Sequence, residues 1–462
     1  MNNTASSTSQ LETDGNRGQL AAGLGTAAHL FFAAFFFLVL TTPSWRYGPF
    51  SWLPLIEFDE LAGGPVRLGV LNLLPGLAAV CWLGSRLLSR HESPFSWQWG
   101  SKHITWPLLG LTIVGIISLI PAPARLQFIH VGGLMLAWLV YLFVLNERPK
   151  LQPVLAAIVL FQGAIAIGQF ISQTDLGLVW LGELPLDPIY EGVSVIFARE
   201  RPWLRAHGLT AHPNFLGAIL TTLLLLLLPT TVRSEGWRRI VWYAAFLVGL
   251  AGLVLTFSRG AGLGFLAGLL TWLLLRDWRT GDRSRPAARI SSLQPLIARY
   301  LKYILPLLLF IPLLWLYSDL FLSRLTHLDA PSEAQSLNQR VDDARLALQL
   351  IAKNPLTGVG LGSYTDVAKE INPAAARVHN VLLLVTAELG LPGLLLLLWL
   401  FLSPFATRPL RASAVAPWVA MLVIGFFDTT LWLTSNWQTA VLFTLLAANL
   451  QLQHSRREPA TN

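Results

Sequence analysis

The sequence predicts an all-α, polytopic membrane protein. Of its 462 residues, 54% are hydrophobic and only 13% are charged, a composition outside the range of soluble domains. The apolar residues are also gathered into runs of about eighteen residues or more that carry few charges. Each run is long enough to cross a hydrocarbon layer about 30 Å thick as a helix. The single cysteine, Cys81, excludes an intramolecular disulfide and a cysteine-based metal site.

About twelve such runs follow one another along the chain, and each is a predicted transmembrane span. They cover residues 20–41, 66–84, 104–121, 126–145, 151–172, 214–232, 239–257, 260–275, 300–318, 379–402, 415–432 and 435–452. Between the seventh and eighth runs the sole charged residue is Arg259, and one continuous helix there would far exceed a bilayer. The chain is therefore expected to turn at residues 258–260. Gly260, Gly264 and Gly268 then share one face of the eighth span, which predicts tight packing against a neighbouring helix.

The ends of the chain and the long loops set the predicted topology. Residues 1–19 are polar and are expected to form a disordered tail, residues 20–453 a single transmembrane domain, and residues 454–462 a second tail. An even number of spans places both termini on one side, where most Lys and Arg residues of the short connections also fall. The positive-inside rule then predicts cytoplasmic termini in the inner membrane. The two long loops, 173–213 and 319–378, are predicted to face the periplasm.

The first outer loop ends in a basic cluster that leads directly into the sixth span. Its members are Arg199, Arg201, Arg205, His207 and His212. Planar, permanently charged guanidinium groups suit phosphate oxygens, so this segment is predicted to bind an anion, with simple interfacial anchoring as the alternative. Asn214 is expected to cap the sixth helix.

Arg259 is isolated at the outer turn between two very apolar spans. An arginine in this position is costly unless it reaches the interface or meets an anion. We therefore predict a functional role for it, with snorkelling to the interface as the alternative.

The second outer loop is predicted to contain a soluble helix. Apolar residues recur with helical spacing from Leu337 to Ile351, and Asn354 and Pro355 end the helix. Arg340 lies on this helix. Glycine-rich residues 358–362 follow, but no strand precedes them and their spacing is not that of a dinucleotide loop. We interpret them as a bent re-entry segment.

His379 ends this loop at the mouth of the tenth span. Its unperturbed pKa of about 6.5 makes a histidine a plausible base for an alcohol at neutral pH, with a hydrogen-bonded structural histidine as the alternative. Several arginines near one histidine would suit transfer from a pyrophosphate, since guanidinium groups stabilise the leaving phosphate while the imidazole accepts a proton. The sequence contains no HExxH, no Asp-x-Asp pair in an outer loop and no GxSxG motif, which argues against metal-hydrolase and serine-hydrolase readings.

Four short motifs resemble those of the O-antigen ligase and polymerase superfamily, and they occur in the same order. His379 and Asn380 are followed after nine residues by Gly390 and then Gly393, which resembles the ligase signature. The other three motifs are Arg205 with Gly208, the turn Ser258-Arg259-Gly260, and Arg340 followed by Asn354-Pro355-Leu356-Thr357-Gly358. One departure is Ala344, where many members carry an aromatic residue.

This resemblance implies a metal-independent glycosyltransferase of the GT-C type that needs no cofactor. Its donor would be a glycan on undecaprenyl pyrophosphate, used at the outer face of the inner membrane. The resemblance implies that Arg205, Arg259 and Arg340 bind the pyrophosphate and that His379 activates the acceptor hydroxyl. The implied supporting residues are Arg201, His212, Asn214, Asn380, Gly390 and Gly393.

The acceptor and the class of activity remain open at this level. A ligase would use lipid A core or another surface acceptor, a polymerase would use a second repeat unit, and an oligosaccharyltransferase would use a protein hydroxyl. A small-solute carrier, for inorganic carbon for example, is a less favoured alternative, because carriers place ionisable groups near the bilayer midplane. Here the span interiors are nearly free of charge, with Asp428 as the main exception. The net charge of +8 is spread over the inter-helix loops, which favours contact with membrane lipids over nucleic acid.

Overall fold

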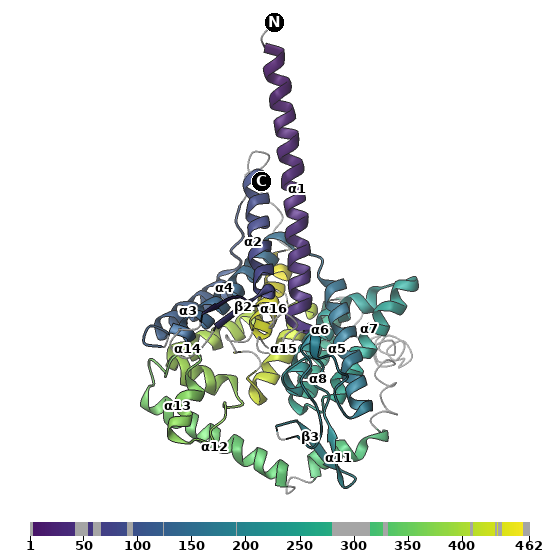
Figure 1. The fold of residues 1–462 in the computed structure, drawn as a ribbon, viewed down its shortest axis with the longest axis vertical. Coiled ribbons are helices and arrows are strands. Elements are labelled where there is room, and N and C mark those ends of the chain that lie inside the picture. The colour runs from purple at the N-terminus through teal and green to yellow at the C-terminus, as the bar shows by residue number, and fades with distance from the viewer. Residues whose placement is uncertain are drawn as a thin grey trace, which may run out of the picture.

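The computed structural model describes residues 3–41, 54–58, 66–89, 96–122, 124–190, 192–279, 315–326, 331–406, 410–429, 432 and 437–455. These residues are mostly helical (Figure 1). The N-terminal helices are α1 (Asn3–Thr41), α2 (Val70–Leu88), α3 (Lys102–Ser118), α4 (Ala124–Glu147) and α5 (Gln152–Ser172). The central ones are α6 (Pro213–Arg233), α7 (Gly236–Leu255) and α8 (Arg259–Arg279). The C-terminal ones are α11 (Ser318–Thr326), α12 (Pro331–Lys353), α13 (Tyr364–Ile371), α14 (Val381–Ala406), α15 (Ala412–Phe427) and α16 (Trp437–Ser455). Two short hairpins, β1 (Pro54–Phe58) with β2 (Val66–Gly69) and β3 (Val195–Ala198) with β4 (Arg201–Leu204), and a short helix η2 (Val179–Leu181) complete the described elements.

The prediction of an all-α membrane protein is confirmed. In the described part of the chain, six helices are long and apolar enough to cross a membrane: Asn16–Thr41, Ile129–Glu147, Gln152–Ser172, Pro213–Arg233, Gly236–Leu255 and Val381–Ala406. Shorter apolar helices lie at five further predicted spans: Leu73–Leu88, Lys102–Ser118, Arg259–Leu275, Ala412–Phe427 and Gln438–Leu452. The predicted ninth span, 300–318, falls mainly outside the described residues.

The first helix is longer than predicted. Residues 3–19, for which the sequence analysis expected a disordered tail, form the first turns of α1. Extending an existing helix costs little compared with nucleating one, so the apolar part of α1 supports the polar turns that precede it.

The turn predicted at residues 258–260 is confirmed, because α7 ends at Leu255 and α8 begins at Arg259. The glycines on α8 pack against α15 as expected. A Cβ on Gly264 would lie 2.8 Å from the Ala420 carbonyl oxygen, and one on Gly268 would lie 2.8 Å from the Ala416 carbonyl oxygen. The two helices therefore meet backbone to backbone along this ridge.

This packing predicts that Gly264→Leu destabilises the protein. The larger side chain would have to displace backbone that is already in contact, and overpacking of this kind costs about 1–3 kcal/mol. Thermal unfolding of the detergent-purified protein measures the loss. Gly262→Leu is the matched control, because nothing lies within 4 Å of a Cβ at Gly262. Equal stability of the two variants would contradict the assignment of this ridge.

The glycine-rich segment of the second outer loop lies against a kink in α14. The kink is at Gly390, whose φ of 67° and ψ of −169° are not helical. Two main-chain hydrogen bonds join the glycine-rich segment to α14. They run from Val359 N to Ala387 O at 2.8 Å and from Gly360 N to Glu388 O at 2.9 Å. The segment thus satisfies carbonyl groups that the kink leaves without a helical partner. Gly390, which was predicted to be a supporting residue of the site, belongs to this structural joint, whereas Gly393 follows it within α14 and lies against Leu389.

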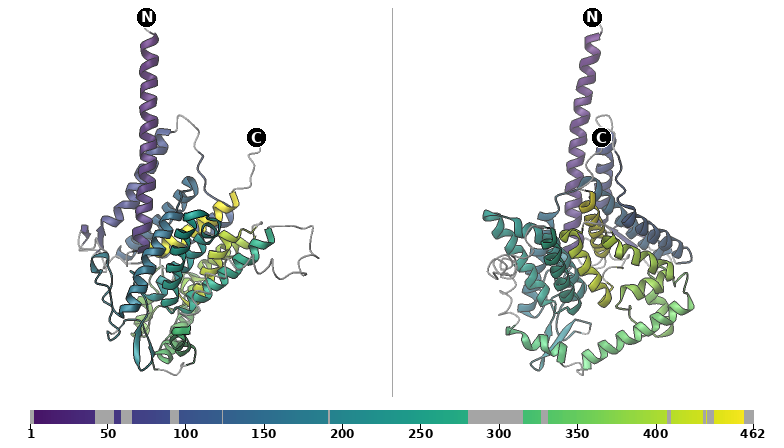
Figure 2. Two further views of the ribbon diagram at one scale, coloured as in Figure 1. Left: turned by 90° about the vertical axis from the view of Figure 1, so that its right-hand side faces the viewer. Right: turned by 180° about the vertical axis from the view of Figure 1, so that it is seen from behind.

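The elements of the two long loops that were predicted to face the periplasm gather at one end of the molecule. The β3–β4 hairpin and helices α11, α12 and α13 lie at the end opposite the N-terminus in all views (Figures 1 and 2). The hairpin was not predicted, since each strand has four residues and its turn residues, Arg199 and Glu200, adopt positive φ without being glycine or asparagine. Arg199 forms an ion pair with Asp319 of α11, with 2.5 Å between Nε and Oδ2. The hairpin is therefore attached to the second outer loop.

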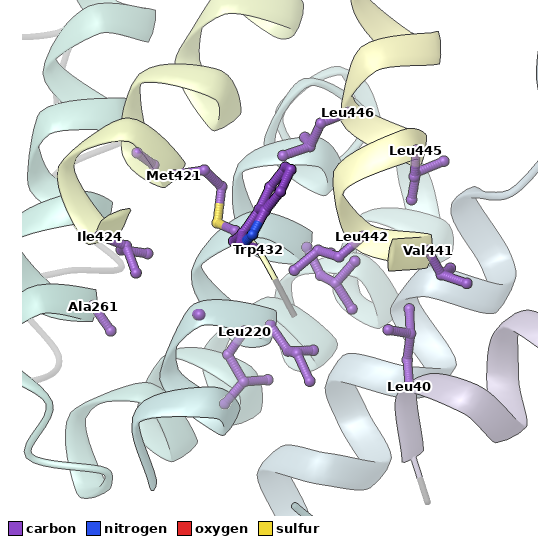
Figure 3. Packing of buried hydrophobic residues seen from close by; sticks show 14 of the residues in the cluster. Leu40, Leu220, Ala261, Met421, Ile424, Trp432, Val441, Leu442, Leu445 and Leu446 are labelled. Carbon is purple, nitrogen blue, oxygen red and sulfur yellow. The ribbon is translucent and has the colours of Figure 1, made fainter. Parts of the chain in front are cut away.

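The core runs continuously between the helices. Figure 3 shows Trp432 enclosed between Met421 of α15 and Leu446 of α16. Trp432 is buried, and its main-chain N–H donates to the carbonyl of Thr429 at 2.9 Å. This packing fixes the segment that follows α15, which carries Asp428.

Candidate functional site

Arg205 follows β4 directly and is buried, with 6% of its surface exposed. Its Nε donates to the Thr256 carbonyl oxygen at 2.9 Å, and its Nη2 donates to Asn214 Oδ1 at 2.8 Å. The adjacent Ala206 N donates to Leu255 O at 3.0 Å. The guanidinium is thus held between the end of α7 and the start of α6.

Asn214 continues this connection to the C-terminal helices. Its Nδ2 donates to Asp428 Oδ2 at 2.8 Å, and Asp428 Oδ1 accepts from Thr429 N at 2.7 Å. Arg205, Asn214 and Asp428 therefore form a hydrogen-bonded chain that joins the start of α6 to Asp428, which is 214 positions after Asn214. The expectation that Asn214 caps α6 is wrong, because His212 occupies the N-cap position.

His212 has both ring nitrogens engaged. Its Nδ1 accepts from Asn214 N at 3.1 Å, so the ring proton lies on Nε2, which is 3.0 Å from Ser194 Oγ. Burial lowers the pKa of His212 well below 6.5, and the charge of Arg205 acts in the same direction. A neutral ring with two hydrogen-bond partners is suited to holding the backbone in place rather than to exchanging a proton.

His207 lies deeper in the same segment. Its Nδ1 is 2.8 Å from the Arg205 carbonyl oxygen, and because a carbonyl can only accept, the proton is on Nδ1. Burial lowers the pKa of His207 to about 4. This histidine is neutral at physiological pH and ties the segment back onto Arg205.

His379 is in a different situation, at the entry to α14. Its Nδ1 is buried and has no hydrogen-bond partner among the described residues. Burial lowers the pKa of His379, Asp428 and Asp343 oppose this shift, and Arg340 and Arg377 reinforce it. The ring is therefore neutral near pH 7, which is the form that a base requires.

Asn380, the neighbour of His379, holds this entry in place. Its Oδ1 accepts from Leu383 N at 3.0 Å, which is a helix-capping contact, and its Nδ2 donates to Phe426 O at 3.3 Å. The start of α14 is thereby tied to the end of α15, two residues before Asp428. This contact brings the predicted base close to the chain of bonds that begins at Arg205.

The structure brings most of the predicted site residues together. Arg340 and Arg205 both act electrostatically on His212, and Arg340 also acts on His379. Arg259 is the first residue of α8, three residues after Thr256, the acceptor for Arg205. The next residue, Gly260, lies against Phe427, because a Cβ there would be 3.1 Å from the Phe427 Cβ.

Arg201 is placed differently from the other predicted residues. It is exposed on β4, with its guanidinium carbon 4.0 Å from the centre of the Trp203 ring. This contact stabilises the hairpin by a cation–π interaction.

Two buried polar groups near Arg205 were not predicted from the sequence. Gln162 and Gln169 on α5 are fully buried and bond to the segment that follows Arg205. Their signal was present in the sequence, since two glutamines seven residues apart in an apolar span share one helical face.

Glu388 is a further correction, because span interiors were described as nearly charge-free apart from Asp428. Glu388 lies inside α14, is buried, and its Oε2 accepts from Trp432 Nε1 at 2.9 Å. The main-chain carbonyl of Glu388 accepts from Gly360 N at 2.9 Å. This residue therefore joins the glycine-rich segment to α14 and to Trp432.

Within the described ranges, no group of three or more His, Cys, Asp or Glu side chains is arranged to hold a metal ion. Residues 244–398 match the family model described as O-antigen ligase. This range includes Arg259, Arg340 and His379, whereas Arg205 and Asp428 lie outside it. A comparison with curated proteins found no match.

Proposed function

Because the chain belongs to the O-antigen ligase superfamily, we propose that it transfers a glycan from undecaprenyl pyrophosphate to an acceptor hydroxyl. Membership was predicted from four short motifs and is confirmed by the match over residues 244–398. The chain is thus a glycosyltransferase-like enzyme of a membrane-embedded superfamily. The donor, the site residues and the GT-C assignment are parts of the proposal.

The proposal rests on the buried Nδ1 of His379, which has no hydrogen-bond partner among the residues that the structure describes. A buried nitrogen without a hydrogen-bond partner is costly, and a substrate hydroxyl would supply the missing contact. In the proposed reaction the acceptor oxygen attacks the anomeric carbon and the neutral imidazole accepts the hydroxyl proton. The bond between the anomeric carbon and the phosphate oxygen breaks, and its electron pair leaves with undecaprenyl pyrophosphate.

The arginines would stabilise the leaving group. Negative charge develops on the pyrophosphate as the glycosidic bond breaks, and fixed guanidinium groups stabilise such charge without reorganising. We assign Arg205 and Arg259 to this role, with Arg340 as a third group close to His379. The hydrogen bonds of Arg205 to Thr256 and Asn214 support this role, because they fix the direction of its fork before substrate arrives.

The proposed topology follows the distribution of charge. About twelve spans, cytoplasmic termini and periplasmic outer loops agree with the concentration of Lys and Arg on the N-terminal side. The placement of β3–β4 and α11–α13 opposite the N-terminus supports this orientation (Figure 2). The donor and acceptor would then meet at the outer face of the inner membrane.

We propose lipid A core, or another surface glycan, as the acceptor. A polymerase or a protein O-oligosaccharyltransferase of the same superfamily would use the same donor chemistry and differ only in the acceptor. A carrier is disfavoured because the buried carboxylates of Asp428 and Glu388 already accept hydrogen bonds from Asn214 and Trp432, respectively.

Reconstitution tests the function directly. Purified protein in liposomes, supplied with undecaprenyl-pyrophosphate glycan, is expected to transfer the glycan to lipid A core and release undecaprenyl pyrophosphate. Mass spectrometry of the products identifies the acceptor when lipid A core, a second donor molecule and a Ser/Thr peptide are offered together. Absence of transfer to all three acceptors would refute the proposed function, and transfer to one of the other two would reassign the acceptor.

A further inference from the structure

Two glutamines on α5 lie beneath the segment that carries Arg205. Gln162 and Gln169 are both fully buried, with no exposed surface. They are seven residues apart, which is about two helical turns, so both side chains leave the same face of α5. Polar side chains inside a membrane span are costly and usually have a defined partner.

Gln169 bonds to two consecutive residues of the segment. Its Oε1 accepts from His207 N at 3.1 Å and from Gly208 N at 2.8 Å, and its Nε2 donates to Gly208 O at 2.9 Å. The amide group therefore pairs with the main chain as a neighbouring β-strand would. It satisfies two main-chain donors and one acceptor, which belong to the second and third residues after Arg205.

Gln162 serves the next residue along the segment. Its Oε1 accepts from Leu209 N at 2.9 Å, and its Nε2 donates to Leu40 O at 2.9 Å. Gly208 has a φ of 55°, and a Cβ there would collide with Gln162 Oε1. The fit between the glutamine and this backbone thus leaves no room for a side chain at Gly208.

The orientation of Gln169 is set by a buried carboxylate. Its Nε2 also donates to Glu183 Oε1 at 2.7 Å, and only the nitrogen of an amide can donate to a carboxylate. Glu183 is itself fixed by the main-chain N–H groups of Leu176 and Leu178, at 2.9 Å and 2.7 Å. Glu183 therefore directs Gln169 Oε1 towards the segment.

These contacts explain how irregular backbone is tolerated inside a helix bundle. Residues 205–210 are all buried and are not helical, so their main-chain groups need partners from the protein. Three consecutive N–H groups obtain them from two side chains of α5. Loss of either glutamine leaves buried donors unsatisfied next to Arg205.

We propose that Gln169, oriented by Glu183, and Gln162 are positioning residues that hold the Arg205 segment in the geometry needed for the donor pyrophosphate. This inference rests on the proposed function of the site. Neither glutamine contacts the substrate in this account. Each acts through the backbone of residues 207–209, which fixes the position of the Arg205 main chain and therefore of its side chain.

Steady-state kinetics tests the positioning role. Gln169→Leu is expected to raise the KM for the polyprenyl-pyrophosphate donor about tenfold or more, with the KM for the acceptor unchanged. Gln152→Leu is the matched control, since Gln152 is on the same helix but exposed. An unchanged donor KM in Gln169→Leu, in protein that is folded and active, would overturn the proposal.

A reciprocal exchange separates positioning from a general loss of packing. Gln169→Glu places a second carboxylate against Glu183 and is expected to raise the donor KM. Adding Glu183→Gln restores one amide and one carboxylate at this contact, while the carboxylate at position 169 still faces the Gly208 carbonyl oxygen, so the donor KM of the double variant is expected to lie between those of Gln169→Glu and the wild type. A double variant that is no better than Gln169→Glu would count against the role of Glu183.

Hydrogen exchange of the amides tests the same contacts without substrate. In Gln169→Leu the amides of residues 207–208 are expected to exchange faster, and in Gln162→Leu the amide of Leu209, while those of α6 keep their wild-type protection. Unchanged exchange at residues 207–209 would overturn the proposal. Faster exchange together with a wild-type protein that cannot use the donor would refute the proposed function instead, leaving α5 as the support of this segment.

Discussion

Replacing His379 with alanine is expected to abolish glycan transfer while the protein still inserts and folds. Without the imidazole no side chain accepts the acceptor proton, and loss of a general base costs about 10²–10⁴-fold in rate. The hydrogen bonds of the Asn380 side chain with Phe426 O and Leu383 N do not involve the imidazole, so the start of α14 should keep its place. Transfer by the reconstituted variant at saturating donor and acceptor measures the effect.

His103→Ala is the control for this variant, because His103 is partly exposed at the start of α3 and belongs to no proposed role. It should transfer glycan at the wild-type rate. Retained turnover in His379→Ala would remove the base from the mechanism and would favour a structural histidine at this position.

The pH profile of the wild-type rate adds an independent check on His379. A base works when it is neutral, so activity is present above its pKa and is lost as pH falls through it. Because burial lowers the pKa of His379 below 6.5, the rate should stay constant down to about pH 6.5 and fall only in more acidic buffer. A decline that begins well above pH 7 would contradict a neutral, buried base.

Hydropathy predicted the helices of this protein because it depends only on the residues within each span. The turn at residues 258–260 was predicted from the length of the apolar run, and the close packing of α8 was predicted from the spacing of its glycines. The end of α12 at Lys353 agrees with the helix break expected at Asn354. Such features depend on short stretches of sequence and on bilayer thickness.

The contacts within the site could not be predicted in the same way. The bond from Asn214 to Asp428 joins residues 214 positions apart, and no local pattern indicates that pairing. The N-cap was assigned to Asn214 because asparagine is a common cap, whereas the cap is a histidine whose imidazole accepts the bond. The β3–β4 hairpin lacks the usual turn residues, and it is stabilised in part by a contact distant in sequence, the ion pair of Arg199 with Asp319.

The sequence motif and the structure also describe different properties of Arg205. The sequence marked Arg205 as an anion ligand because of its neighbours, but it did not indicate that the side chain is buried and directed by Thr256 and Asn214. The glutamines that support its backbone are more than thirty residues earlier in the chain, in a span that reads as apolar. A search for paired polar residues on one face of each predicted span would have found them.

Arg205→Lys is the second substitution with a large expected effect. Lysine keeps the charge but lacks the planar fork, so a single ammonium nitrogen cannot occupy the two positions from which arginine Nε and Nη2 donate to Thr256 O and Asn214 Oδ1. Losing a directed donor to the leaving group typically costs about 10²–10³-fold, or about 2.7–4 kcal/mol of transition-state stabilisation. We therefore expect kcat/KM for the donor to fall by about that factor.

The hydrogen bonds lost in Arg205→Lys are also structural, so the variant is expected to change stability as well as activity. An unsatisfied Asn214 Oδ1 loosens the link to Asp428, so the variant should also lose about 1–3 kcal/mol of stability, which thermal unfolding measures separately from activity. Arg238→Lys makes the same chemical change at an exposed residue of α7 and should leave both properties unchanged. If Arg205→Lys unfolds earlier yet retains the donor kcat/KM, the arginine is a structural link between α6 and α7. If both values fall, the fork that holds the helices together also directs charge to the pyrophosphate, and the burial of Arg205 is part of the reaction chemistry.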